Sequence, residues 1–138
     1  MAQTNEPLLS VKGLKQYFPV SKKFTVRAVD NISFDIYPGE TYGLVGESGS
    51  GKSTTGRSII RLYDPTEGTI LFNGEDISKK LTAKQEKMLR SDMQMVFQDP
   101  MASLNPHKKI LDTIAMGLDA HHPHMDPKER VERVSKMM

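Results

Sequence analysis

The stretch GLVGESGSGKSTTGRSI, residues 43–59, decides how the fold of this chain is predicted. It places glycines, serines and threonines around a single lysine, which is unsuitable material for a hydrophobic core. The run 41–45, which leads into this stretch and includes its first three residues, is short, apolar and β-prone, as expected of a buried strand. Residues 53–63 after it favour a helix that ends before Pro65, because proline disfavours helical backbone in the preceding residue. Strand, glycine loop and helix in this order predict an α/β fold.

The glycine loop itself carries the chemistry. Residues 46–53, GESGSGKS, match G-x-x-x-x-G-K-[ST] at every fixed position, which is the pattern of a phosphate-binding P-loop. Glycines let the backbone curl so that its N–H groups surround a phosphate chain, and the following helix directs its positive end at the same phosphates. The predicted nucleotide contacts are Gly46, Glu47, Ser48, Gly49, Ser50, Gly51, Lys52, Ser53 and Thr54.

Three of these residues have distinct expected roles. Lys52 would reach the β and γ phosphate oxygens as a mobile charge, Ser53 would place its hydroxyl on Mg²⁺, and Thr54 would add a hydroxyl near the α-phosphate. The cofactors predicted from the loop are therefore ATP and Mg²⁺. The alternative is a flexible Gly/Ser-rich connection with a solvated lysine, which would make the match and its flanking elements accidental.

The remaining pattern adds strands and helices on both sides of the loop. A strand with its turn is expected at 8–18, and the alternating apolar residues of 25–36 predict a second strand, followed by a turn at Pro38 and Gly39. Another strand, 68–77, contains a turn at Asn73 and Gly74. The other predicted elements are a basic helical segment at 82–90, a short strand at 93–97, and helices at 110–118 and 127–138.

Composition limits the class of protein. With 138 residues, 37% apolar and 26% charged, the chain fits one globular domain. A net charge of +2 gives no reason to expect a nucleic-acid partner. The absence of cysteine excludes disulfides and thiolate metal sites, and no apolar stretch approaches the roughly 18 residues of a spanning helix.

The wider sequence resembles a known family. VDNISFDIYPGETYGLVGESGSGKSTTGRSIIRLYDPTEGTILFNGEDI is similar to the nucleotide-binding subunits of ABC transporters, in which an antiparallel strand pair leads through PGE to the P-loop. The resemblance implies an α/β P-loop NTPase with an antiparallel β subdomain, an incomplete parallel core sheet and the start of a helical subdomain. The resemblance implies one domain, 1–138, in four parts. These are the β subdomain with the P-loop strand (8–45), the P-loop and its helix (46–63), strands with the Q-loop (64–109), and the start of the helical subdomain (110–138).

Two further motifs match this family. MVFQDP resembles its Q-loop, so the resemblance gives Gln98 contacts with Mg²⁺ and the attacking water, and a role in sensing the membrane subunit. GLKQYF resembles the A-loop, whose aromatic ring stacks on adenine; Phe18 is favoured by register and Tyr17 is the second choice. A polar strand end for Gln98 and a core aromatic for Phe18 are the structural alternatives.

Within the family, the chain is most similar to the ATPases of oligopeptide and dipeptide importers, and SLNP at 103–106 carries most of that assignment. The implied partners are a second, different ATPase subunit, transmembrane permease subunits contacted through the loop 98–109, and, indirectly, an extracytoplasmic peptide-binding protein. The implied location is the cytoplasmic face of the membrane. The alternatives are a soluble ABC-class ATPase of DNA repair or translation, and a nucleotide-binding module without turnover.

Several parts that hydrolysis requires in this family do not occur in the 138 residues: an LSGGQ-type segment, the apolar strand ending in Asp-Glu, a following Asp and a late His. Glu75 and Asp76 follow an Asn-Gly turn, which does not suit a buried carboxylate pair at a strand end. We therefore expect these residues to be the amino-terminal part of a longer subunit and to lack turnover alone. HHPH at 121–124 and the lysines of 79–87 are expected to be solvated.

Overall fold

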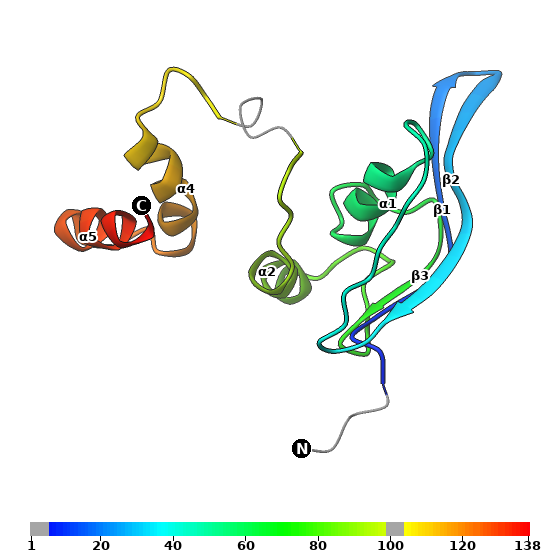
Figure 1. The fold of residues 1–138 in the computed structure, drawn as a ribbon, viewed down its shortest axis with the longest axis horizontal. Helices are drawn as coiled ribbons and strands as arrows, with labels where there is room; N and C mark the ends of the chain where they lie inside the picture. Colours follow the sequence, from blue (N-terminus) through cyan, green and yellow to red (C-terminus); the bar gives the residue numbers. More distant parts are fainter. Residues whose placement is uncertain (1–5, 99–103) are drawn as a thin grey trace. The chain divides into compact units, whose positions relative to one another are not determined.

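The structure is a computed structural model that describes residues 6–98 and 104–138. These residues form two compact units, one that ends at Met95 and one that begins at Val96. Figure 1 shows the course of the chain from the strands of the first unit to the helices of the second.

The first unit is built on one antiparallel sheet of four strands in the order β2-β1-β3-β4 (Figure 1). The strands are β1 (Leu9–Ser21), β2 (Phe24–Ile36), β3 (Glu67–Phe72) and β4 (Glu75–Asp76). This confirms the predicted antiparallel strand pair before the glycine loop and the predicted strand after it. The turn between β3 and β4 has Asn73 at φ 49° and Gly74 at φ 77°, as the Asn-Gly pair predicted.

Strand β1 holds the sheet together, because Leu9 pairs with Ile36 of β2 and with Phe72 of β3. The core lies beneath it and combines strand residues, one residue just after β4 (Ile77) and one helix residue (Leu89): Leu9, Val11, Leu14, Val29, Ile70, Phe72, Ile77 and Leu89. Gly68 has φ 101°, and a Cβ there would lie 2.6 Å from the carbonyl oxygen of Gly13. Strands β1 and β3 can therefore approach closely only with glycine at this position.

Two helices complete the first unit. Helix α1 (Lys52–Ile59) follows the glycine loop and contacts β1 and β2. It ends earlier than the predicted 53–63, since Arg61 adopts a left-handed backbone with φ 59°. Helix α2 (Ala83–Asp92) begins at a capping box in which Thr82 and Gln85 exchange hydrogen bonds, and it buries Leu89 in the core.

The predicted strands at 41–45 and 93–97 are wrong for this structure, in which both segments are irregular. Val45 is 90% exposed and Val96 is 96% exposed. A strand requires a neighbour for its backbone hydrogen bonds, and no strand within residues 6–98 and 104–138 pairs with either segment. The expected parallel pairing is accordingly absent from the described sheet. Tyr42 is nevertheless held near β2, since its ring stacks on Phe34 with centroids 4.9 Å apart.

The second unit contains a pair of helices, α4 (Ile110–His121) and α5 (Pro127–Met137), in the two places predicted. Asp126 caps α5 by accepting hydrogen bonds from the backbone N–H groups that follow it. Arg130 of α5 donates to both carboxylate oxygens of Asp119 at 2.7 and 2.9 Å, and this pairing lowers the pKa of Asp119. The two helices thus form a hairpin that is stabilised by this ion pair. No helix among the described residues is long and apolar enough to cross a membrane.

Replacing Gly68 tests the close approach of β1 and β3. We expect Gly68→Ala to lower the free energy of unfolding by about 3 kcal/mol, because the new methyl group meets backbone atoms and the φ of 101° disfavours alanine. Gly39→Ala is the matched control: its φ is 78° but its Cβ would meet no atom within 4 Å, so it should cost about 1 kcal/mol. Urea unfolding measures both values. Equal losses would show that the backbone contact is unimportant.

Candidate phosphate-binding site

Helix α1 begins directly in the glycine loop. Its N-cap is Gly51, which has φ 91°, and no side chain caps the helix. The first hydrogen bond of the helix runs from the N–H of Thr55 to the oxygen of Gly51 at 2.8 Å, and the first turn contains no acidic residue. The positive end of the helix is therefore not neutralised by its own side chains, which suits it to bind an anion.

The loop before the helix curls tightly. The N–H of Ser50 donates to the oxygen of Glu47 at 3.2 Å, and Gly49 has φ 81°. A Cβ at Gly46 would lie 2.7 Å from the Oγ of Ser50. Glycine thus suits both positions: Gly49 has a backbone angle that other residues rarely adopt, and Gly46 leaves room for the Ser50 hydroxyl, as in a backbone cradle for phosphate.

The loop and helix are fixed to the sheet at two points. A Cβ at Gly51 would lie 2.2 Å from the backbone oxygen of Ala28, so the loop rests directly on β2. Further along the helix, the buried Ser58 hydroxyl lies 3.2 Å from the Oε1 of Gln16 on β1 and 2.9 Å from the oxygen of Thr54. These contacts set the start of α1 against the hairpin of β1 and β2.

Lys52 turns back over the loop. Its Nζ donates to the oxygen of Gly46 at 2.7 Å, to the oxygen of Glu47 at 2.6 Å and to the Oγ of Ser50 at 3.3 Å. All three contacts are exposed, so anionic oxygens that enter the loop can compete for the same ammonium protons. The lysine charge is directed into the loop rather than out to solvent.

An open hollow of about 450 Å³ lies between the loop and β2. Its walls are formed by Val26, Arg27, Ala28, Gly49, Ser50, Gly51, Lys52, Ser53 and Thr54. Six of the predicted contacts therefore line one space, while Gly46, Glu47 and Ser48 form the preceding part of the loop. The β2 wall was not predicted from the sequence. The close contact between Gly51 and Ala28 brings that strand to the loop, and no sequence motif signals it.

The lining matches the chemistry of a phosphate chain. It offers the free N–H groups at the start of α1, the ammonium group of Lys52 and the hydroxyls of Ser53 and Thr54. No carboxylate lines the hollow among the described residues. No group of three or more acidic, histidine or cysteine side chains there could hold a metal alone. That fits Mg²⁺ in phosphate sites, where the protein provides one or two ligands and the phosphates provide others.

The two aromatic candidates differ in their surroundings. Phe18 lies opposite Val26, which lines the hollow, and its half-buried ring packs edge-on against Tyr63 at 5.3 Å. Tyr17 donates its hydroxyl proton to Asp30 at 2.5 Å, which raises the pKa of Tyr17, and the guanidinium of Arg27 lies 5.4 Å from its ring centroid. Because one face of the Tyr17 ring is covered, Phe18 remains the better candidate for stacking on a base.

Gln98 is exposed and belongs to the second unit, whereas the hollow lies in the first unit, so its contact with Mg²⁺ stays a prediction. Residues 99–103 of the predicted coupling loop lie outside the described residues. The expectation for Glu75 and Asp76 is confirmed, because both lie exposed in the short β4 after the turn.

The secondary features also follow the sequence reading. His121 at the end of α4 and His122, Pro123 and His124 after it are all exposed, as expected of a solvated segment. The lysines of 79–87 are exposed as well. These segments therefore give no second candidate site.

Comparison with known proteins agrees with this geometry. The family model for ABC transporters matches residues 29–138. The oligopeptide transport ATP-binding protein OppF of Bacillus subtilis is 56% identical over 133 residues, which cover 96% of this chain and 43% of the relative. The dipeptide transport ATP-binding protein DppF of Lactococcus lactis is 46% identical, with 95% and 42% covered. The chain thus spans less than half the length of these curated relatives.

Solved structures show the same fold. The dimeric post-hydrolysis state of the ATP-binding cassette MJ0796 bound to ADP and Pi aligns with a TM-score of 0.74 at 25% identity, covering 93% of this chain and 54% of that one. The cbiO1 protein of Clostridium perfringens, part of the transporter complex cbiONQ, aligns with a TM-score of 0.67 at 26% identity, with 96% and 49% covered. The α/β fold predicted from the P-loop stretch is therefore confirmed.

Gly51 provides a structural test of the site. Gly51→Ala should push the loop away from β2, because its methyl group would overlap the Ala28 oxygen, and the hydrogen-bonded amides of Ser50 and Thr55 should then exchange with solvent about tenfold faster. Gly49→Ala has a similar φ but meets no atom within 4 Å, so exchange at Thr55 should change little. Hydrogen exchange measured by mass spectrometry compares the two. Unchanged exchange in Gly51→Ala would contradict the docking of the loop on β2.

Proposed function

Because the chain belongs to the ABC transporter family, we propose that it is the ATP-binding part of a subunit that powers peptide import by binding and hydrolysing ATP. The observation that carries the proposal is the glycine loop, in which the uncapped start of α1 and the charge of Lys52 line one hollow. The peptide substrate is supported by the names of the relatives, which are oligopeptide and dipeptide transport proteins. The loop thus argues for the nucleotide, and the relatives argue for the cargo.

Within this proposal the residues around the hollow divide the work on the nucleotide. Backbone N–H groups of residues 46–53 bind the phosphate chain, Lys52 pairs with its outer oxygens, and Thr54 binds near the α-phosphate. Ser53 holds Mg²⁺ through its hydroxyl, and the bound ion supplies positive charge that stabilises the transferred phosphoryl group. Phe18 stacks on the adenine, since its strand partner Val26 lines the same hollow.

The coupling to transport is assigned to the segment that begins at Gln98. We propose that Gln98 contacts Mg²⁺ and the attacking water and that residues 98–109 meet the permease subunits. A second, different ATPase subunit would close against this one, and the peptide-binding protein would act on the far side of the permease. This arrangement places the subunit at the cytoplasmic face of the membrane as a peripheral protein.

Removal of the Lys52 ammonium group tests the nucleotide site. In the full-length chain, Lys52→Ala should weaken the binding of a fluorescent ATP analogue with Mg²⁺ about 100-fold or more, because several charge-assisted hydrogen bonds to phosphate are lost. Lys23→Ala, in the exposed turn between β1 and β2, is the matched control and should bind as the wild type does. An equal affinity in Lys52→Ala would remove the assignment of ATP to this loop.

Replacement of Gln98 tests the coupling. Gln98→Ala should keep its ATP affinity within about threefold and lose peptide uptake by cells that carry the full-length chain with its transporter, since the P-loop contacts remain intact. The matched control is Gln94→Ala, whose amide donates to the oxygen of Arg90 at 2.7 Å and which should transport normally. Wild-type uptake of a labelled peptide by Gln98→Ala would argue against the proposed role. ATP hydrolysis without any peptide transport in the wild type would favour the soluble ATPase instead.

A further inference from the structure

The end of helix α1 has an unusual residue for its backbone. After the C-cap Ile60, Arg61 adopts φ 59°, a left-handed conformation in which glycine is the common choice. Its N–H donates to the oxygen of Ser58 at 3.2 Å. A side chain is disfavoured at such a φ, so the arginine must make contacts that offset the cost.

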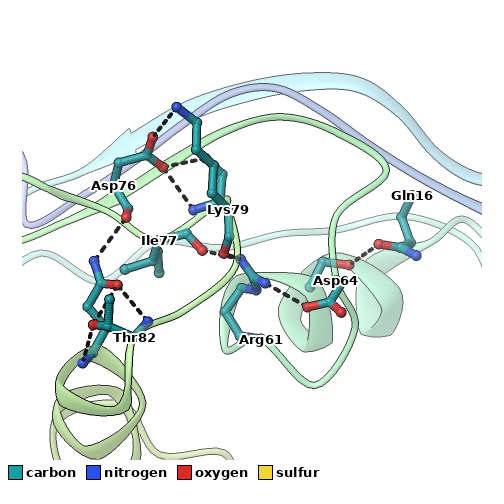
Figure 2. A network of polar contacts seen from close by, with 10 residues as sticks. Gln16, Arg61, Asp64, Asp76, Ile77, Lys79 and Thr82 are labelled. Atoms are coloured by element: carbon teal, nitrogen blue, oxygen red, sulfur yellow. Dashed lines mark hydrogen bonds and ion pairs between the residues drawn. The ribbon is translucent and has the colours of Figure 1, made fainter.

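Those contacts use both terminal nitrogens of the guanidinium group, and the Arg61 side chain is only 4% exposed. Nη1 donates to the oxygen of Ile77 and, at 3.1 Å, to the oxygen of Lys79; Nη2 donates to Asp64 at 2.6 Å. The Nε atom is buried without a partner among the described residues. Figure 2 shows the guanidinium reaching from the end of α1 to the segment after β4.

The segment that Arg61 holds is connected in turn to helix α2. The oxygen of Asp76 accepts a hydrogen bond from the Nε2 of Gln85 at 3.2 Å, and the same Gln85 forms the capping box of α2 with Thr82 (Figure 2). Ser78 fixes the turn by donating from its backbone N–H and its hydroxyl to the Asp76 carboxylate. A continuous series of polar contacts therefore runs from the end of α1 to the start of α2.

We propose that Arg61 is a positioning residue that couples the P-loop helix to residues 77–82 and α2. The inference rests on the proposed function, since α1 begins at the phosphate-binding loop and ends at this arginine. A short helix moves as a rigid body, so a shift of its start on nucleotide binding reaches its end. The planar guanidinium group of Arg61 then transmits the shift to residues 77–79. Helix α2 and the segment that leads to Gln98 come after these residues in the chain.

Arg61→Gly separates coupling from stability. Glycine suits the left-handed backbone, so the variant loses the guanidinium contacts while its backbone strain is relieved. In the full-length wild type, Mg²⁺–ATP should slow amide exchange at 46–54 and also at 77–82 by about fivefold or more. In Arg61→Gly the protection at 46–54 should remain and that at 77–82 should fall below about twofold. Asp64→Asn is the matched control and should keep both, because the two carbonyl contacts persist.

A second variant tests the series one step further along. Gln85→Ala removes the contact with Asp76, so ATP should still protect 77–79 and no longer protect the start of α2 at 83–86. The coupling would be overturned if ATP protected residues 77–82 equally in the wild type and in Arg61→Gly. Equal protection of residues 83–86 in the wild type and in Gln85→Ala would overturn it as well. Failure of ATP to protect 46–54 in the wild type would instead overturn the proposed function, and the inference with it.

Discussion

The close approach of Gly51 to the backbone oxygen of Ala28 determines where helix α1 starts and what lies beside it. Since a Cβ at Gly51 would come within 2.2 Å of that oxygen, the loop can rest on β2 only with glycine there. Lys52 follows at once as the first residue of α1, and β2 becomes the second wall of the hollow. The residues proposed to bind phosphate therefore owe their arrangement to a contact between the loop and a strand that carries no motif.

Local rules account for most of what the sequence predicted. The pattern of residues 46–53 fixes a curled loop and an uncapped helix start, because the backbone angles at Gly49 and Gly51 are accessible chiefly to glycine. The Asn73–Gly74 pair produced the predicted turn between β3 and β4, and the predicted helical segment at 82–90 is α2, whose start the structure shows to be a capping box of Thr82 and Gln85. In each case the residues that decide the structure are neighbours in the chain.

Features that depend on distant partners were not predictable in this way. The apolar runs at 41–45 and 93–97 have strand composition, yet a strand forms only against another strand, and none lies beside them among the described residues. The early end of α1 depends on Arg61, whose guanidinium binds carbonyls at 77 and 79 that no sequence pattern connects to it. The β2 wall of the hollow likewise follows from tertiary packing alone, as does any contact of Gln98 with the nucleotide.

The amide resonances of the loop glycines test most directly whether the loop and the start of α1 bind phosphate. The full-length chain labelled with ¹⁵N-glycine would be titrated with Mg²⁺–ATP and, separately, with adenosine. If the loop and the start of α1 bind phosphate, the resonances of Gly49 and Gly51 should shift with Mg²⁺–ATP and remain in place with adenosine. Resonances that stay unchanged with Mg²⁺–ATP, or that shift equally with adenosine, would contradict a phosphate site in this loop.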